Sequence, residues 1–258
     1  MSTSRTTLFG IIRHDVPLSQ YREMGARPDF KCVGRYSISE TAKAYAAGVL
    51  IAPRWVLTAA HFVQDSSVWK FGEHFYATKK IVKHPQRRPN AEETQWNGWD
   101  MALVELKKPV LDIIPAVRYR GNTELGKTIT KLGYGFLGDG QRGLSSPRSQ
   151  EKLGGQNVVD AIGGTFEGRR FSTNVMICDF DDPKNPGTNQ WGSPIPLELE
   201  IGGSKGDSGG GVFMEENGKT VLVGIVSGAL NRRIKYGSVM ALARVSTASV
   251  WIDSVIGP

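Results

Sequence analysis

The sequence contains few cysteines and no long apolar run. Only two of its 258 residues are cysteine, Cys32 and Cys178, so a disulfide framework is excluded as the main source of stability. The two could pair with each other, but two small buried thiols are the favoured interpretation. No run of about 18 apolar residues predicts a membrane span, and residues 1–10 lack the apolar stretch of a signal peptide. We therefore expect a cytoplasmic protein with no membrane partner, or a secreted one if a leader has been removed.

Patterns for metal and nucleic-acid binding are also missing. No Cys-x-x-Cys pair or Cys/His cluster predicts zinc, and we expect no cofactor. The net charge is +7, but the basic pairs are scattered without interleaved aromatic residues, which favours solvated loop tips over nucleic-acid binding. The carboxylates of Asp179, Asp181 and Asp182 could bind Ca²⁺, although the EF-hand spacing is absent and a solvated loop is favoured.

Short runs of β-branched and aromatic residues fill most of the chain, and Gly, Pro and Asn separate them. From Ser246 onward, apolar residues recur at helical spacing, which predicts a C-terminal helix. Two loop-rich stretches break the pattern: Phe136–Gln150 is expected to be mobile, and Asp179–Pro196 is long enough to favour a functional role. The runs themselves predict an all-β barrel or sandwich, with strands at Val49–Ile51, Trp55–Thr58, Phe75–Val82, Met101–Leu106, Thr128–Leu132, Asn174–Phe180, Gly211–Met214, Val221–Val226 and Ser238–Val245.

A glycine-rich run surrounds one serine, Ser208, in the sequence GSKGDSGG. Glycine loses much conformational freedom on folding, so such a run is typical of places where backbone N–H groups must approach a ligand. The N–H groups of Gly206 and Ser208 could stabilise the negative charge that develops when a serine attacks a carbonyl. A tight glycine turn carrying a solvated serine is the alternative.

A nucleophilic serine needs a base and an acid that orients the base. Among four histidines, His61 follows an apolar strand-like run and small residues, whereas His14 and His84 are interpreted as surface residues and His74 as a loop or strand-edge residue. Asp100 precedes another strand-like run, where it is either a cap or a functional acid. Each residue alone has a structural explanation, and the three together favour catalysis.

Three segments occur in the order His, Asp, Ser: LTAAH ending at His61, WDMALVEL containing Asp100, and GDSGG containing Ser208. They resemble the signature segments of trypsin-like (chymotrypsin-fold) serine proteases. The order is that of this fold and differs from the orders in subtilisins and α/β-hydrolases. The resemblance runs from about residue 46 to the end of the chain.

The resemblance implies an all-β fold of two six-stranded antiparallel Greek-key β-barrels with the active site between them and a C-terminal helix. The expected domains are an N-terminal extension over 1–45, a first barrel over 46–115 and a second barrel over 116–258. The first barrel would carry the histidine and the aspartate, and the second would carry the serine.

The resemblance also implies the roles of the site residues. His61 would act as general base and then general acid, Asp100 would orient it, and Ser208 would attack. The N–H groups of Gly206 and Ser208 would form the oxyanion hole. Ser227 would support Asp100, and the backbone of residues 227–229 (Ser227, Gly228 and Ala229) would pair with substrate as an added strand.

The primary specificity pocket departs from that of trypsin. Six positions before Ser208 stands Gly202, where trypsin has an aspartate. With Met240 at another lining position and Ala229 near the entrance, a small apolar pocket is favoured. Glu200, or an acid of the 179–182 loop, could still supply a charge for basic side chains.

Activation is a further open point. In the family that the chain resembles, cleavage frees an N-terminal amino group that pairs with the aspartate before the nucleophile, here Asp207. Cleavage after Gly10 would expose Ile11, so Ile11 or Ile12 is the expected start of an active form. The alternatives are another group that holds Asp207, or a partner protein that orders the site.

The sequence therefore predicts a serine endopeptidase that acts on protein or peptide substrates, with a possible activating or regulatory partner. A pseudoprotease scaffold is less favoured because all three triad residues are present. An esterase using the same site is less favoured because residues 227–229 suit an extended peptide backbone.

Overall fold

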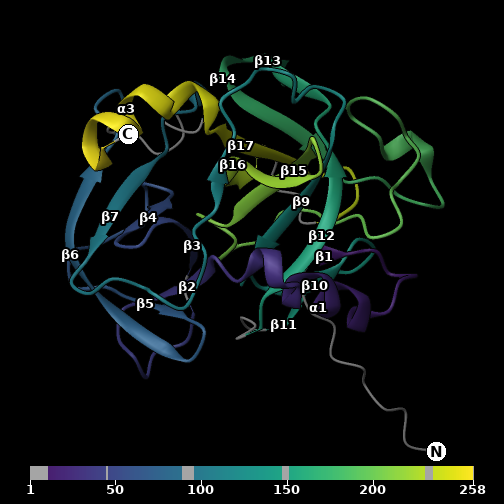
Figure 1. The fold of residues 1–258 in the computed structure, drawn as a ribbon. Coiled ribbons are helices and arrows are strands. Elements are labelled where there is room, and N and C mark those ends of the chain that lie inside the picture. Colours follow the sequence, from purple (N-terminus) through teal and green to yellow (C-terminus); the bar gives the residue numbers. More distant parts are fainter. Residues whose placement is uncertain (1–10, 45, 89–95, 147–150, 230–234, 258) are drawn as a thin grey trace, which may run out of the picture.

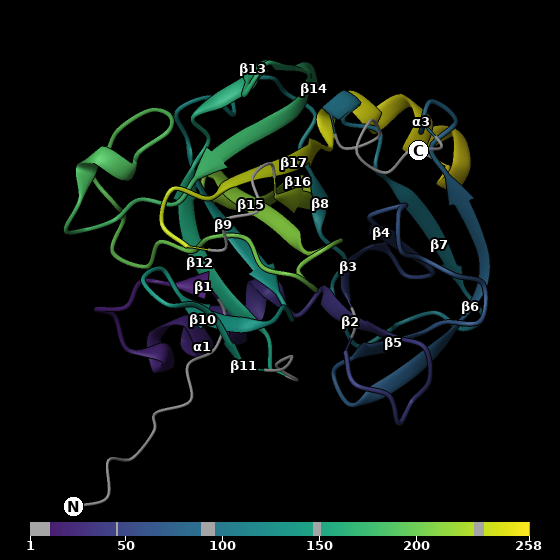
Figure 2. The ribbon, with the colours of Figure 1, turned by 180° about the vertical axis from the view of Figure 1, so that it is seen from behind.

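The computed structural model describes residues 11–44, 46–88, 96–146, 151–229 and 235–257. Two β-rich units lie side by side, with the first on the left and the second on the right in Figure 1 and reversed in Figure 2. The two-barrel fold expected from the sequence is confirmed. Within the described residues, no helix is both long and apolar enough to cross a membrane.

The first unit is a closed barrel in the order β2-β3-β4-β7-β6-β5. Trp69 and Tyr36 fill its interior with their rings 5.1 Å apart, edge to face. The barrel begins at Val33 rather than near residue 46, so the expected boundary of the extension is wrong: β2 pairs with β3 and β5 and closes the cylinder. The strands are β2 (Val33–Ser37), β3 (Ala46–Ala52), β4 (Trp55–Thr58), β5 (Val68–Phe71), β6 (His74–Lys83) and β7 (Ala102–Leu106).

The second unit is an eight-stranded sheet in the order β12-β9-β15-β16-β17-β14-β13, with β8 added in parallel beside β16. The sheet curls so that β12, at one end, approaches β14 near the other end: the side-chain amide of Asn157 in β12 donates to the carbonyl of Asp179 in β14 at 2.6 Å. It has two strands more than the six expected. The eight strands of the sheet are β8 (Val117–Arg118), β9 (Thr128–Gly133), β12 (Leu153–Val158), β13 (Ala161–Phe166), β14 (Arg169–Asp179), β15 (Gly211–Glu216), β16 (Lys219–Ala229) and β17 (Val239–Arg244).

The N-terminal segment packs on the second unit. Strand β1 (Ile11–Ile12) runs parallel to β10 (Leu137–Asp139), which pairs with β11 (Gly143–Ser146). The 136–150 stretch therefore contains a hairpin that its Gly- and Ser-rich sequence does not predict. Helix α1 (Leu18–Ala26) follows β1 and lies against β12 beneath the second unit (Figure 1). A short 3-10 helix, η1 (Pro28–Phe30), then leads into the first barrel.

Helix α1 can lie close to β12 because it carries a glycine at the contact. A Cβ atom on Gly25 would come within 2.3 Å of the Lys152 carbonyl oxygen. On the same helix, the fully buried Tyr21 donates its hydroxyl to the carbonyl of Glu200 at 3.0 Å. The N-terminal segment is therefore an integral part of the second unit.

The chain ends in the expected helix, which crosses back to the first barrel (Figure 1). A 3-10 turn, η3 (Ser246–Ala248), leads into α3 (Ser249–Ile256), and Ile252 packs in the first-barrel core. The interpretation of His84 as a surface residue is wrong. Its ring stacks on Trp99 with centroids 4.2 Å apart and is only 5% exposed, and burial lowers its pKa to about 4.

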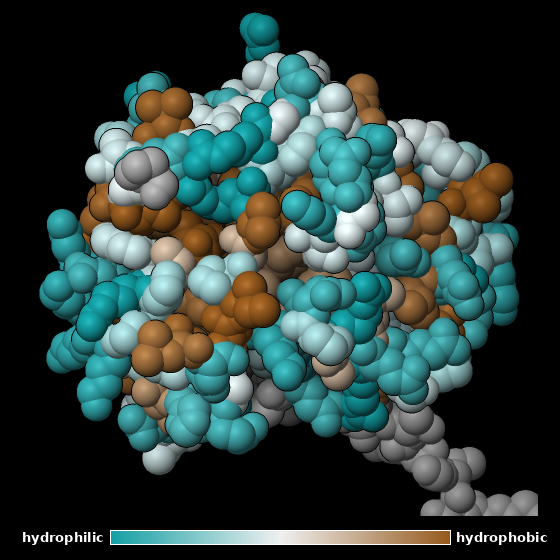
Figure 3. Space-filling view, in the orientation of Figure 1, coloured by the Kyte–Doolittle hydropathy of each residue, from teal (hydrophilic) through white to brown (hydrophobic). Residues whose placement is uncertain are grey.

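One apolar cluster joins the two units. Leu132, Phe213 and Leu222 of the second unit pack in the same cluster as the first-barrel core. On the face shown in Figure 3, apolar side chains appear near the middle, where the units meet, within a largely polar surface. Cys32 and Cys178 are free, buried thiols in different clusters.

Candidate active site

His61 lies just beyond the end of β4, on the side of the first barrel that faces the second unit. Strand β4 is buried, and Thr58 at its end donates its hydroxyl to the carbonyl of Ala47 at 2.7 Å. This bond ties the segment before the histidine to β3. The side chain of His61 retains 21% exposure, which leaves its ring accessible from the seam between the units.

Asp100 stands two residues before β7 and is fully buried. Its Oδ2 lies 2.7 Å from Nδ1 of His61, and its Oδ1 accepts the backbone N–H of His61 at 3.0 Å. The hydroxyl of Ser227, in β16, donates to Oδ2 at 2.6 Å. A carboxylate held this way fixes the imidazole with Nδ1 protonated and leaves Nε2 as an acceptor. The expected support of Asp100 by Ser227 is present in the structure.

Ser208 precedes β15 and belongs to the second unit. Its Oγ lies 3.0 Å from Nε2 of His61, so the three side chains form one continuous chain of hydrogen bonds. The backbone N–H of Ala47, in β3, donates to the carbonyl of Ser208 at 2.9 Å. This bond across the seam fixes Ser208 against the barrel that carries His61.

Two backbone N–H groups near Ser208 are available to a ligand. Gly206 adopts φ +89°, which side-chain-bearing residues rarely adopt. Among the described residues, neither Gly206 N–H nor Ser208 N–H has a hydrogen-bond acceptor, and both residues are half-buried. Two unpaired backbone donors beside a serine hydroxyl are the arrangement that an oxyanion hole requires.

The two glycines at the start of the segment before Ser208 pack on apolar side chains. A Cβ on Gly202 would come within 2.9 Å of the Phe180 ring, and one on Gly203 within 2.9 Å of Met240. Phe180 and Met240 are both fully buried. The structure therefore brings the expected Met240 beside the segment before the nucleophile, and it adds Phe180, which the sequence did not indicate.

The end of β16 pairs with the strand that carries Met240. Gly228 and Ala229 pair with Ala241 and Met240 of β17, whereas pairing with β15 runs only to Ile225. Gly228 is half-buried and Ala229 is exposed. The main-chain groups of Gly228 and Ala229 are therefore within reach of an extended peptide backbone that lies beside them.

The sequence profile of the trypsin family, described as Trypsin, matches residues 23–252. The chain belongs to the trypsin family of serine endopeptidases. A snake venom serine protease (KN5) of Trimeresurus stejnegeri is 32% identical over 36% of this chain and 39% of its own length. The collagenase of Hypoderma lineatum is 24% identical over 86% of this chain and 80% of its own length. Mouse neuropsin, a serine protease of the limbic system, has the same fold, with a TM-score of 0.66 and 15% identity over 90% of this chain and 98% of neuropsin.

In this trypsin-family chain, the acids considered for the primary specificity pocket are buried and hydrogen-bonded within the protein. Both oxygens of Glu200 accept backbone N–H groups, from Asp181 at 2.7 Å and Leu197 at 2.6 Å. Burial raises the pKa of Glu200 to about 8 and that of Asp181 to about 7. Both groups therefore hold their protons more tightly than ordinary carboxyls, which weakens them as fixed counter-charges for a basic substrate.

The acidic loop holds itself together through its own backbone. Asp179 accepts the N–H of Gln190 at 2.6 Å, and Asp182 accepts that of Lys184 at 2.9 Å. Within the described ranges, no group of three or more His, Cys, Asp or Glu side chains is arranged to hold a metal ion. The loop contains one short 3-10 helix, η2 (Pro186–Thr188).

Asp207 has a partner other than the one expected. The ammonium group of Lys131 donates to its Oδ2 at 2.5 Å, and Ile11 lies instead in β1, where its carbonyl accepts the N–H of Gly202 at 2.9 Å. In this uncleaved chain, β1 is held in a sheet with β10, and a lysine occupies the carboxylate. The alternative that another group holds Asp207 is therefore the one present before cleavage, and pairing of a new Ile11 N-terminus with Asp207 stays a prediction.

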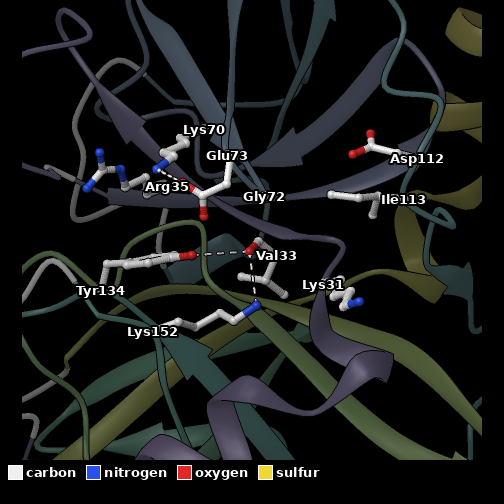
Figure 4. Close-up of a pocket in the computed structure, with 10 residues that line it drawn as sticks. All are labelled: Lys31, Val33, Arg35, Lys70, Gly72, Glu73, Asp112, Ile113, Tyr134 and Lys152. Carbon is white, nitrogen blue, oxygen red and sulfur yellow. Dashed lines mark hydrogen bonds and ion pairs between the residues drawn. The ribbon is translucent and has the colours of Figure 1, made fainter.

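A pocket of about 390 Å³ lies between the units, and none of His61, Asp100 and Ser208 lines it (Figure 4). The ammonium group of Lys152 and the hydroxyl of Tyr134, both from the second unit, point toward the carbonyl of Val33 in the first barrel, each at 3.4 Å. Burial lowers the pKa of Lys152 to about 8. We interpret this pocket as part of the joint between the barrels.

Sequence reasoning missed Lys131 and Phe180. Lys131 shares the inward face of β9 with Ile129, since residues two apart in a strand point to the same side. A charged residue at such a position predicts a buried partner, and this signal could have found it. Phe180 directly follows β14, and nothing in the sequence indicates which side of the loop its ring occupies.

Proposed function

We propose that this chain hydrolyses peptide bonds through an acyl-enzyme formed on Ser208. The observation that carries the proposal is the continuous chain from Asp100 through His61 to the Ser208 hydroxyl, with contacts of 2.7 and 3.0 Å. In a family of serine endopeptidases, this arrangement supplies a nucleophile, a base and an orienting acid in contact.

The reaction proceeds in two halves. Ser208 Oγ attacks the substrate carbonyl carbon while its proton passes to Nε2 of His61, and the N–H groups of Gly206 and Ser208 hold the resulting oxyanion. His61 then gives the proton to the leaving amine, and the C–N bond breaks. In the second half, His61 takes a proton from water, whose oxygen attacks the acyl carbon, and then returns the proton to Ser208 Oγ as the acid product leaves.

We propose that the primary pocket accepts small or apolar side chains. The rings and sulfur that surround Gly202 and Gly203 are uncharged, and a Cβ at either glycine would collide with Phe180 or Met240. The substrate backbone pairs with the end of β16 as an added strand. Preference for peptides over simple esters follows from this pairing.

Labelling with a serine-directed fluorophosphonate tests the catalytic proposal. The unaltered chain should react, Ser208→Ala should not, and Ser254→Ala, an exposed serine on α3, should react like the parent. An unlabelled parent would favour a non-catalytic scaffold. A parent that is labelled and hydrolyses esters but not peptides would favour an esterase.

A peptide library tests the pocket proposal. Met240→Ala should shift preference toward larger apolar side chains at the cleavage site, because the methionine lies under Gly203. Met176→Ala removes an equally buried methionine that packs on Gly224 instead and serves as the control. A parent that prefers Arg or Lys would refute the apolar pocket.

A further inference from the structure

The loop that carries Ser208 is anchored by an ion pair inside the second unit. Lys131 and Asp207 are 1% and 5% exposed. The Lys131 ammonium group donates to Asp207 Oδ2 at 2.5 Å and to the carbonyl of Gly202 at 2.8 Å. We propose that Lys131 is the positioning residue that builds the oxyanion hole in the uncleaved chain, so that no new N-terminus is needed for activity. This inference rests on the proposed function of Ser208.

Asp207 connects this charge to the reacting groups. Its Oδ1 accepts the N–H of Gly135 at 3.0 Å, and its Oδ2 accepts that of Ser204 at 3.0 Å as well as the lysine. Asp207 stands between Gly206 and Ser208, whose N–H groups have no hydrogen-bond acceptor among the described residues. Fixing the Asp207 side chain therefore fixes the peptide groups on both sides of it.

The cation is held rigidly because Lys131 lies in the middle of a sheet. Its backbone pairs with Gly155 of β12 on one side and Val212 of β15 on the other. A carboxylate buried without a partner would carry a large desolvation penalty or take up a proton. The ammonium group of Lys131 removes that penalty. Because Lys131 belongs to a strand within the sheet, its charge is in place without cleavage of the chain.

The space around the pair does not admit a second cation. The cavity beside Lys131 and Asp207 has a volume of about 10 Å³, which is near the lower limit for one water molecule. Ile11 lies elsewhere, with its side chain in a cluster with Phe180 and Tyr236. To reach Asp207, Ile11 would have to leave β1 and displace the lysine.

Substitution of Lys131 tests the positioning role. Lys131→Met should lower kcat/KM by at least about 100-fold, mostly in kcat, because oxyanion donors act on the transition state more than on bound substrate. Its affinity for a peptide aldehyde, which forms a tetrahedral adduct at Ser208, should fall in parallel while KM changes little. Lys131→Arg should restore part of the activity.

The matched control is Lys127→Met, which removes an exposed positive charge just before the same strand. All rates are referred to active sites titrated with fluorophosphonate, and folding is checked by thermal unfolding. If Lys131→Met lowers only the number of titratable sites and leaves kcat per site unchanged, the role is structural and the proposal is wrong. If Lys131→Met does not fold, the double variant Lys131→Met with Asp207→Asn removes both charges, and kcat per site near the parental value would refute the proposal.

A second experiment separates this inference from the proposed function. An enterokinase site replaces residues 6–10, so that digestion exposes Ile11 at the N-terminus, and mass spectrometry verifies both forms. We expect the uncleaved chain to be as active as the digested one, within about twofold. Activity that appears only after digestion would overturn the inference but keep the proposed function, whereas inactivity of both forms would refute the proposed function itself.

Discussion

The two halves of the molecule position their catalytic side chains by different means. Among the described residues of the first barrel, Asp100 is the one buried Asp, Glu, Lys or Arg side chain, and the other buried side chains are apolar, hydroxyl-bearing or histidine. Among the described residues of the second unit, eight side chains of these four types are buried: Glu124, Lys131, Asp139, Asp179, Asp181, Glu200, Asp207 and Arg244. His61 therefore follows the buried strand β4 and Asp100 precedes the buried strand β7 of a closed barrel, while Ser208 stands on the long connection between β14 and β15, where an ion pair anchors it.

This difference predicts how the stability of each half should respond to pH, salt and substitution. Apolar packing depends on shape and tolerates changes of pH and salt, whereas a buried charge needs its partner and a defined protonation state. The predictions below probe this contrast, and the first expects the largest effect.

The single buried carboxylate of the first barrel should matter for catalysis more than for folding. Asp100→Asn should lower kcat by about 10⁴-fold, because an amide can favour the wrong tautomer of His61. Steady-state kinetics and circular dichroism check this, with Ser227→Ala as a milder variant that removes one hydrogen bond to the same carboxylate. A fall of less than tenfold would show that Asp100 does not orient the base.

A buried pair of the second unit should matter for folding. Arg244 contacts Glu124 at 2.8 Å, and both are buried. Arg244→Met should lower the free energy of unfolding by about 3–5 kcal/mol, because Glu124 is left buried and unpaired. Urea unfolding measures the loss, and adding Glu124→Leu should recover most of it. If the double variant does not recover stability, the loss in Arg244→Met comes from packing, as expected for the first barrel, and not from the unpaired charge of Glu124.

The carboxyl of Glu200 should make stability depend on pH. Burial raises its pKa from 4.5 to about 8, so between these values the folded state binds more protons than the unfolded state and stability falls as pH rises. Glu200→Gln cannot ionise. Its stability relative to the parent should therefore increase by about 2–4 kcal/mol between pH 4.5 and 8, at about 1.4 kcal/mol per pKa unit. Glu198→Gln, an exposed neighbour, should show no such trend in thermal unfolding scans.

A surface pair of the first barrel should contribute least. Lys79 and Glu105 meet across β6 and β7 at 2.7 Å, but the lysine side chain is 57% exposed. Lys79→Ala should change the free energy of unfolding by less than about 1 kcal/mol, and by less still in high salt. A larger, salt-resistant loss would mean that charge stabilises the first barrel as well.

The parts of the fold that follow from apolar patterning were predictable. Strand β4 covers Trp55–Thr58, the range expected, and β9 extends the expected Thr128–Leu132 by one residue. Strand β2 was missed because Gly34 and Arg35 interrupt its apolar pattern, and it forms only when β3 and β5 pair with it. Pairing between distant segments leaves little local signal.

The same division holds at the site. His61, Asp100 and Ser208 were selected because their motifs combine residue type, spacing and order, and the structure brings them together. Lys131 was not identified as the group that holds Asp207, because that contact depends on how β9 sits beside the loop that carries Ser208. Tertiary contacts of this kind cannot be read from spacing along the chain.

The hydrogen bond from Ala47 to Ser208 has a consequence for synthesis of the protein. Its two ends belong to different halves, and the strands that hold Ser208 in place, β15 to β17, follow it in the chain. A growing chain that ends before these strands lacks the sheet on which its nucleophile depends. We expect the chain to become able to cut peptide bonds only once β15 to β17 have left the ribosome.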